Sequence, residues 1–226
     1  MPFQPPPLST QLQSQDINMD IPMTYLHLHA GADKPLLLLF HGYEDTAAGV
    51  LRRSLGDPDD RYEILAINGP FPVPVKIENG WKQTFAWYFA DYSKKQVLIP
   101  PTIAATAVGK IVQNLNLGDR PKAMIGFSQG GFFLPFVLPH LKNVKKVFAM
   151  GAGYRPEDYP RDFSLSVDAF HGTEDQVIPL QFANESFRNL ARINPKGEFF
   201  TFEGLGHTMS DESRLVLRKR IDEAFL

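Results

Sequence analysis

Gly126-Phe127-Ser128-Gln129-Gly130-Gly131 is the stretch that decides the fold. A short apolar run at 122–125 precedes it and an apolar stretch at 132–138 follows it, which predicts a strand, a sharp turn and a buried helix. A serine on such a turn has strained backbone and an outward-pointing hydroxyl, and glycines two residues to either side remove the side chains that would block the bend. The stretch therefore predicts a nucleophile elbow.

The composition is that of one globular domain. The chain has 226 residues, of which 43% are apolar and 21% charged, so it can build one substantial core and is barely long enough for two. A net charge of −2 provides no basic field for nucleic acid or an anionic membrane. The longest aliphatic-aromatic run, at 36–40, is too short to cross a bilayer. We therefore expect neither a nucleic-acid partner nor membrane insertion.

The sequence contains no cysteine. This excludes disulfides, thiolate metal sites and cysteine nucleophiles, and it favours a reducing compartment. The first lysine or arginine is Lys34, so the beginning of the sequence lacks the charged region of a signal peptide. We expect a cytoplasmic protein.

Strand and helix patterns alternate along the chain. Residues 1–22 are polar and rich in proline, and we expect an extended or disordered arm there. A continuous apolar run, which is typical of a strand covered on both faces, occurs at 36–40, and further strands are predicted at 62–67 and 144–150. Helical patterns lie between and after these segments. The alternation predicts one α/β domain over 23–226, with a mostly parallel sheet and helices on both faces.

Two further patterns make local predictions. Ile103, Ala107, Ile111 and Leu115 recur every four residues after Pro100, which predicts an amphipathic helix with these residues on its apolar face. The region from 69 to 92 combines prolines, glycines and many aromatic residues. It predicts a long irregular connection of the kind that often carries binding function.

The segment Tyr25-Leu26-His27-Leu28-His29 alternates between apolar and polar positions, which predicts a half-buried strand. His27 and His29 share one face, so a pair of metal ligands is conceivable. No third ligand is close in the sequence. A solvent-facing strand edge is therefore the favoured interpretation, and no metal site is expected.

Two later turns contain the groups that would activate the serine. Asp175 and His207 each follow a predicted strand, and in an open α/β sheet the carboxyl ends of the strands meet at one edge. His207 would accept the proton of Ser128, and Asp175 would orient the imidazole. The chain order Ser, Asp, His is that of an α/β-hydrolase. Glu174 is the rival acid, which we expect to be solvated.

An oxyanion hole requires two backbone N–H groups. One is expected from Gln129, directly after the serine, and the other from Tyr43, in the loop after the 36–40 strand. His41 lies in the same loop. We interpret it as an anchor of that loop, because His207 already fills the role of the base.

These segments resemble the carboxylesterase/phospholipase family of α/β-hydrolases, which includes the acyl-protein thioesterases. The matching segments are Phe40-His41-Gly42 with Asp45, Gly126 to Gly131, His171-Gly172-Thr173-Glu174-Asp175 with Val177 and Pro179, and Gly206-His207 with Ser210. The region 68–91 also resembles the family's tryptophan-containing loop beside the active site. The resemblance implies hydrolysis of carboxylic esters or thioesters without a cofactor.

The sequence departs from the family pattern at two places. Glu44 stands where the family usually has glycine, and Phe132 and Phe133 replace the small residue that commonly follows the elbow. A buried acid at position 44 would disfavour an anionic substrate. These departures concern the choice of substrate more than the mechanism.

The leading hypothesis is a serine carboxylesterase for small esters with short to medium acyl groups. Trp87, Phe71 and Phe132 are the candidate substrate-binding residues, although core packing is the default interpretation for the aromatic side chains between Phe71 and Tyr92. A thioesterase or a lysophospholipase is an alternative activity, and a binding protein that has lost turnover is an alternative of another class. The sequence is compatible with a monomer or a homodimer.

Overall fold

The computed structural model describes residues 22–57, 60–91, 93–94, 96–160, 164–194 and 196–226. The predicted N-terminal arm, residues 1–22, therefore lies outside the described residues except for Pro22.

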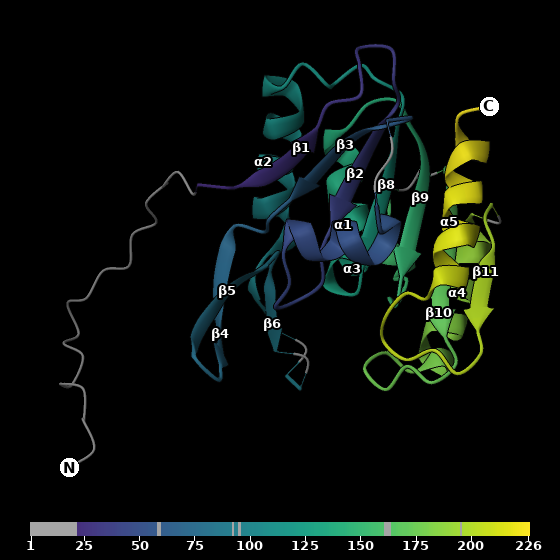
Figure 1. Ribbon diagram of the computed structural model, residues 1–226. Helices are drawn as coiled ribbons and strands as arrows, with labels where there is room; N and C mark the ends of the chain where they lie inside the picture. Colours follow the sequence, from purple (N-terminus) through teal and green to yellow (C-terminus); the bar gives the residue numbers. More distant parts are fainter. Residues whose placement is uncertain (1–21, 58–59, 92, 95, 161–163, 195) are drawn as a thin grey trace, which may run out of the picture.

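A seven-stranded sheet forms the centre of the molecule (Figure 1). Its strands, in spatial order, are β1 (Tyr25–Leu28), β3 (Glu63–Ile67), β2 (Leu36–Phe40), β8 (Lys122–Phe127), β9 (Val144–Met150), β10 (Ser166–Gly172) and β11 (Phe199–Phe202). The edge strand β1 is antiparallel to β3, and every other neighbouring pair is parallel. The predicted mostly parallel sheet is confirmed.

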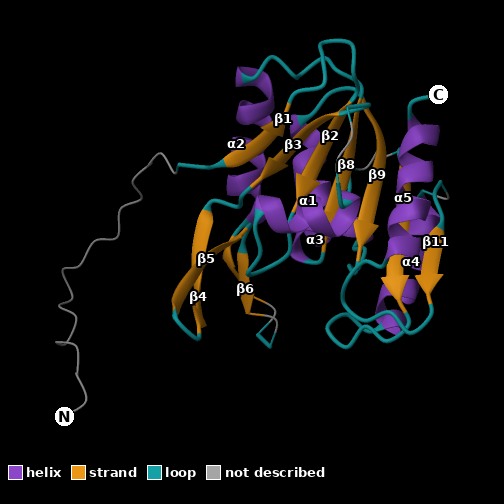
Figure 2. Ribbon diagram, in the orientation of Figure 1, coloured by secondary structure: helices purple, strands orange, loops and turns teal. Residues whose placement is uncertain are grey.

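Helices cover both faces of the sheet, as Figure 2 shows. The helices of one face are α1 (Ala47–Leu55) and α5 (Asp211–Ala224), and those of the other are α2 (Pro101–Asn114), α3 (Gln129–Val137) and α4 (Leu180–Ile193). Two 3-10 turns, η1 (Leu138–His140) and η2 (Pro156–Asp158), complete the set among the described residues. Ser210 begins α5 with a capping box, which satisfies N–H groups that the first turn of a helix leaves free.

The core has two layers because successive side chains of a strand point to opposite faces. In β2, Leu36, Leu38 and Phe40 join the layer under α2, α3 and α4, whereas Leu37 and Leu39 join the layer under α1 and α5. All five side chains are fully buried. Each contributes about 1.5–3 kcal/mol by leaving water, which explains why an uninterrupted apolar run is stable at this position.

The buried face of α2 differs from the predicted one. The period of the pattern was correct, but the side chains at the centre of the interface are Ala104, Ala105, Val108 and Val112. Ile103 is 47% exposed. Small side chains face inward because α2 lies close to its neighbours. At Gly109, for example, an added Cβ would be only 2.8 Å from the His140 side chain.

The sequence predicted a long irregular connection at 69–92, and the structure contradicts this prediction. It forms an antiparallel hairpin of β4 (Phe71–Ile77) and β5 (Gly80–Ala86), followed by β6 (Phe89–Asp91) and its partner β7 (Gln96–Ile99). Pro72 and Pro74 are tolerated in β4 because this strand pairs on only one side, so the missing N–H groups face away from the ladder. The β4–β5 hairpin projects from the body of the molecule (Figure 1).

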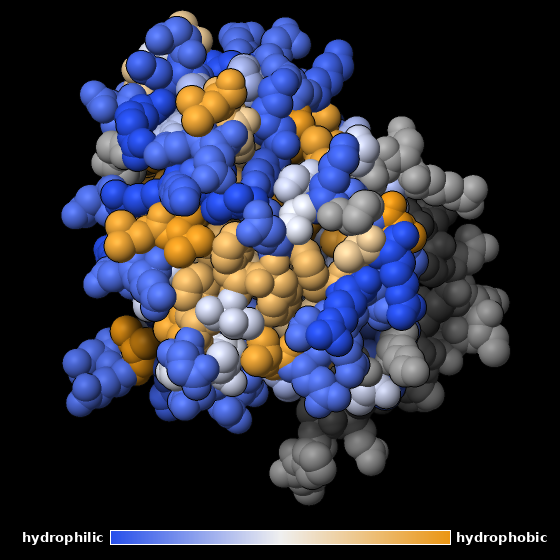
Figure 3. All heavy atoms as spheres, turned by 90° about the vertical axis from the view of Figure 1, so that its right-hand side faces the viewer, coloured by the Kyte–Doolittle hydropathy of each residue, from blue (hydrophilic) through white to orange (hydrophobic). Residues whose placement is uncertain are grey.

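Side chains cover the faces of the edge strand β11. Figure 3 views this side of the molecule and shows hydrophobic residues surrounded by hydrophilic ones. The rings of Phe199 and Phe200 are partly buried; Phe199 lies against Phe187 of α4, and the Arg220 guanidinium lies 5.6 Å from the centre of the Phe200 ring. These contacts cover both faces of β11.

Across the described residues, we find no helix with both the length and the apolar character that a bilayer span requires.

The first turn of α3 lies directly on the backbone of β2. A Cβ atom at Gly130 would be 2.1 Å from the Phe40 carbonyl oxygen, and one at Gly126 would be 2.5 Å from the Gly130 carbonyl oxygen. Backbone atoms cannot yield as a flexible side chain can, so only glycine fits at both positions.

Gly130→Ala should therefore lower the free energy of unfolding by at least about 2 kcal/mol through overpacking. Gly118→Ala is the matched control, because no atom lies within 4 Å of a Cβ at that position. Urea denaturation of both variants measures the effect. Equal midpoints for the two variants would contradict the close approach.

Candidate active site

Ser128 occupies a strained turn between β8 and α3. Its backbone has φ 51° and ψ −119°, a region that costs a residue other than glycine about 1–3 kcal/mol. The surroundings hold it there, since the Ser128 N–H donates to the Met150 carbonyl of β9 at 2.8 Å. The side chain lies at the N-terminus of α3 and remains partly exposed.

Asp175 and His207 meet at the carboxyl edge of the sheet, each in the turn that follows its strand. The Nδ1–H of His207 donates to Oδ2 of Asp175 at 2.7 Å. The other carboxylate oxygen accepts from the N–H groups of Val177 and Ile178 at 2.9 and 2.8 Å. Since Nδ1 carries the proton, Nε2 keeps a free lone pair with which to accept another.

Glu174 does not compete with Asp175 for the imidazole. It is exposed to solvent, as the sequence suggested, whereas the Asp175 side chain is only 1% exposed. A buried carboxylate with fixed donors holds an imidazole in one orientation better than a solvated one.

The His207 ring lies next to the elbow. It contacts the Phe127 ring, with 4.9 Å between the ring centres, and its Cε1 would be 3.1 Å from a Cβ at Gly151. No hydrogen bond joins the Ser128 hydroxyl to His207 within the part of the chain that the structure describes. Catalytic hydrogen bonds of this kind commonly tighten when substrate binds.

The loop after β2 brings a second backbone donor to the serine. A Cβ at Gly42 would lie 3.3 Å from the Cβ of Ser128. Neither the Tyr43 nor the Gln129 N–H donates to another described residue, so both remain available to a bound group.

Glu44 adopts the left-handed backbone that glycine would adopt, with φ 56°. The loop thus keeps the conformation that a glycine would favour, at some steric cost. The Glu44 side chain is exposed, so the buried acid considered from the sequence is absent from this position.

His41 anchors this loop. Its ring is completely buried, its Nδ1–H donates to the Gly42 carbonyl at 2.6 Å, and its Nε2 accepts from the Gly69 N–H at 2.8 Å. Burial lowers the pKa of His41 to about 4, although the hydrogen bond to Gly42 and the charge of Asp45 act in the opposite direction. A neutral ring with both nitrogens engaged holds the loop and is not free to act as a base.

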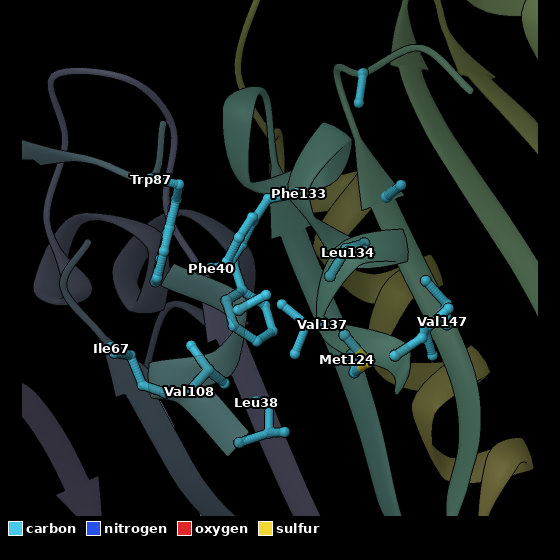
Figure 4. Packing of buried hydrophobic residues seen from close by; sticks show 14 of the residues in the cluster. Leu38, Phe40, Ile67, Trp87, Val108, Met124, Phe133, Leu134, Val137 and Val147 are labelled. Carbon is cyan, nitrogen blue, oxygen red and sulfur yellow. The ribbon is translucent and has the colours of Figure 1, made fainter. Parts of the chain in front are cut away.

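Trp87 lies beneath the loop rather than on a binding surface. It has no exposed area, stacks on Phe133 with 4.6 Å between ring centres, and donates its indole N–H to the His41 carbonyl at 2.8 Å. Figure 4 shows Trp87, Phe133 and Phe40 in contact within the core. The substrate-binding role expected of Trp87 does not fit this position, because other residues cover the ring entirely.

The Gln129 side chain has a role that the sequence did not suggest. Its Oε1 accepts from the Trp87 N–H at 2.8 Å, and its Nε2 donates to the Tyr88 carbonyl at 3.0 Å. The residue after the serine thus fixes the aromatic segment to the elbow. Only its backbone N–H was considered from the sequence, because the partner is 42 positions away.

His171 is a second residue that sequence reasoning did not assign. Its side chain is fully buried, and its Nε2 lies 2.7 Å from the Ile178 carbonyl and 3.5 Å from Oδ2 of Asp175. Within the described residues its Nδ1 has no hydrogen-bond partner. The hydrogen bond of the ring to the Ile178 carbonyl stabilises the turn in which Asp175 lies.

Phe132 and Phe71 have different aromatic neighbours. Phe132 follows Ser128 by one helical turn, is partly exposed, and approaches Phe182 of α4 across Gly153. The Phe71 ring contacts Phe89, with 5.8 Å between ring centres, and Phe89 in turn contacts Tyr43.

Two other features lie away from these residues. A hollow of about 640 Å³ between α2 and η1 contains none of the candidate residues. On strand β3, Glu63 lies beside His27 and His29. The third possible metal ligand, which the sequence did not place near these histidines, comes from a strand 34 residues further along the chain.

Comparisons with known proteins identify the family and the fold. A family model described as phospholipase/carboxylesterase matches residues 23–223. The fold is similar to that of SOBER1 from Arabidopsis thaliana, with a TM-score of 0.67 and 20% identity, over 85% of this chain and 100% of that one. Acyl-protein thioesterase 2 from Zea mays gives a TM-score of 0.65 and 19% identity, over 90% and 98% of the two chains. The Bacillus cereus carboxylesterase gives 0.60 and 18%, over 89% and 94%. A search of curated protein sequences found no significant match.

The low pKa of His41 predicts how stability depends on pH. An unfolded histidine titrates near 6.5, and the folded value is about 4. The stability that the neutral ring contributes is therefore complete above pH 6.5 and is lost as the pH falls towards 4. Between pH 6.5 and 4.5 this loss amounts to about 2 kcal/mol.

His41→Gln should flatten the dependence of unfolding free energy on pH in this window, and urea denaturation at several pH values measures the slope. The test compares the slope of unfolding free energy against pH, which can be determined even if the variant is less stable at every pH. His140→Gln, which replaces a half-buried histidine, should keep the slope of the unmodified protein. An unchanged slope in His41→Gln would show that the ring is not held neutral.

Proposed function

The chain belongs to the phospholipase/carboxylesterase family of α/β-hydrolases, and we propose that it is a serine hydrolase that cleaves carboxylic esters with short to medium acyl chains. The observation that carries this proposal is the 2.7 Å hydrogen bond between His207 and a buried Asp175, next to the strained turn of Ser128. Strain of this kind is retained where it contributes to function.

In the proposed reaction, the Ser128 hydroxyl attacks the carbonyl carbon of the ester while Nε2 of His207 takes its proton. When the tetrahedral intermediate collapses, the bond to the alcohol breaks and His207 returns the proton to the leaving oxygen. Water then attacks the acyl-enzyme by the same route and releases the acid. Asp175 stays ionised throughout and stabilises the imidazolium.

The oxyanion of the intermediate would be held by the N–H groups of Tyr43 and Gln129. Their freedom from other described partners supports this role, and the N-terminus of α3 adds a favourable partial charge. Fixed donors of this type need no reorganisation during the reaction.

The surroundings of Ser128 favour a small neutral ester. Phe132 and Phe71 are partly exposed apolar side chains and are the proposed substrate contacts, while Trp87 supports the oxyanion loop through its hydrogen bond to the His41 carbonyl. The exposed negative charge of Glu44 would repel an anionic acyl group, weakly because solvent screens it. We place the activity in the cytoplasm, in keeping with the absence of cysteine from the sequence.

Ser128→Ala should lower kcat on an activated ester by several orders of magnitude and leave the fold intact, because alanine has no nucleophile. It should also abolish covalent labelling by a fluorophosphonate probe, which mass spectrometry of the intact protein detects. If the unmodified protein does not react with the probe and does not turn over the ester, the chain is a binding protein on a hydrolase fold.

Asp175→Asn tests the triad as a unit. Asparagine can hold the imidazole in the wrong tautomer, so kcat should fall by up to about ten-thousand-fold. Glu174→Gln is the matched control one residue earlier and should change kcat by less than about twofold, since Glu174 is exposed. Steady-state kinetics on the same ester compare the two. The reverse result would assign the acid to Glu174.

A further inference from the structure

A cluster of two histidines and one glutamate lies at the sheet edge opposite to the elbow. His27 and His29 come from the edge strand β1 and the residues that follow it, and Glu63 is the first residue of the neighbouring β3 (Figure 1). The parallel strand β3 runs from Glu63 towards the carboxyl edge, where Ser128 lies. The cluster is therefore separate from the candidate active site.

The three side chains converge on one point. Nε2 of His27 lies 2.6 Å from Oε1 of Glu63, and Nδ1 of His29 lies 3.1 Å from the same oxygen. One ligand atom from each residue lies within 4.8 Å of the other two. The antiparallel pairing of β1 with β3 explains this convergence, because alternate residues of β1 face the same side as Glu63.

The second oxygen of Glu63 is fixed by surrounding donors. Oε2 accepts from the N–H groups of Ala30 and Gly31 at 2.9 and 3.3 Å and lies 3.4 Å from the Arg120 guanidinium. A carboxylate that is held in one orientation by fixed donors is a prepared metal ligand.

We propose that His27, His29 and Glu63 bind a divalent metal ion of the zinc class. Two imidazole nitrogens and one carboxylate oxygen form a donor set that suits zinc, whereas magnesium and calcium prefer oxygen ligands. Tetrahedral coordination separates neighbouring ligand atoms by about 3.3 Å. The 2.6 Å contact of His27 with Oε1 must therefore widen by about 0.7 Å and the 3.1 Å contact of His29 by about 0.2 Å, and the ion replaces the protons now shared there.

The exposure of the two imidazoles suits this proposal. The His29 side chain is 75% exposed and free to adjust, whereas the His27 side chain is 11% exposed and supplies a fixed ligand. The fourth coordination position faces solvent on the His29 side. The ion would join β1 to β3 and so fasten an edge strand that otherwise pairs on one side only, which makes this a stabilising site.

The test is a zinc titration of the full chain after removal of metals with a chelator, followed by calorimetry and thermal unfolding. The unmodified protein should bind one zinc ion per chain with a dissociation constant in the micromolar range or below, and zinc should raise its melting temperature. His29→Gln should weaken binding at least tenfold, since loss of even an outer-shell partner costs about 10–100-fold. This residue is exposed, so the variant should fold, which circular dichroism checks.

Two control variants separate this site from the other histidines. His140→Gln and His207→Gln should keep the affinity and the zinc-dependent melting shift. Cobalt should give the absorption of a four-coordinate site in the unmodified protein and lose it in His29→Gln. The proposal is overturned if zinc does not bind one to one, or if His29→Gln binds zinc as tightly as the unmodified protein; the cluster is then an ion pair without a metal.

Discussion

The contact between the first turn of α3 and the backbone of β2 is the constraint on which the rest of the site depends. Without a side chain at Gly130, the helix begins within van der Waals distance of the Phe40 carbonyl. The chain must then turn sharply at Ser128, which accounts for the positive φ of that residue. The same contact brings the loop at Gly42 against Ser128, so the proposed nucleophile and the proposed oxyanion donors share one steric origin.

The sequence predicted the main features of the fold because they have local causes. The apolar run of β2 requires cover on both faces, and the glycines of the elbow permit only one kind of turn. The hairpins after Gly69 were missed because Pro72 and Pro74 usually break strands, and only the tertiary structure shows that β4 has an unpaired side. The inward face of α2 likewise depends on how closely its neighbours approach.

The candidate site likewise has features that the sequence predicted and features that only the structure shows. The order of Ser128, Asp175 and His207 could be read from the chain because each follows a predicted strand. The contacts of the Gln129 side chain, and the meeting of Glu63 with two histidines of β1, join residues more than 30 positions apart. The sequence left both a substrate contact and core packing open for Trp87, because an aromatic residue beside a site and one beneath it have the same local sequence; its burial distinguishes them.

The β4–β5 hairpin is fastened at one end only. Its base is held where the Asp45 carbonyl accepts from the Phe85 N–H at 2.9 Å, whereas the far end carries Trp81, which is 68% exposed. Insertions and deletions in the turn at 78–79 can therefore accumulate during evolution without moving the loop after β2. Homologues can diverge in the reach and chemistry of this hairpin while the candidate active site stays unchanged.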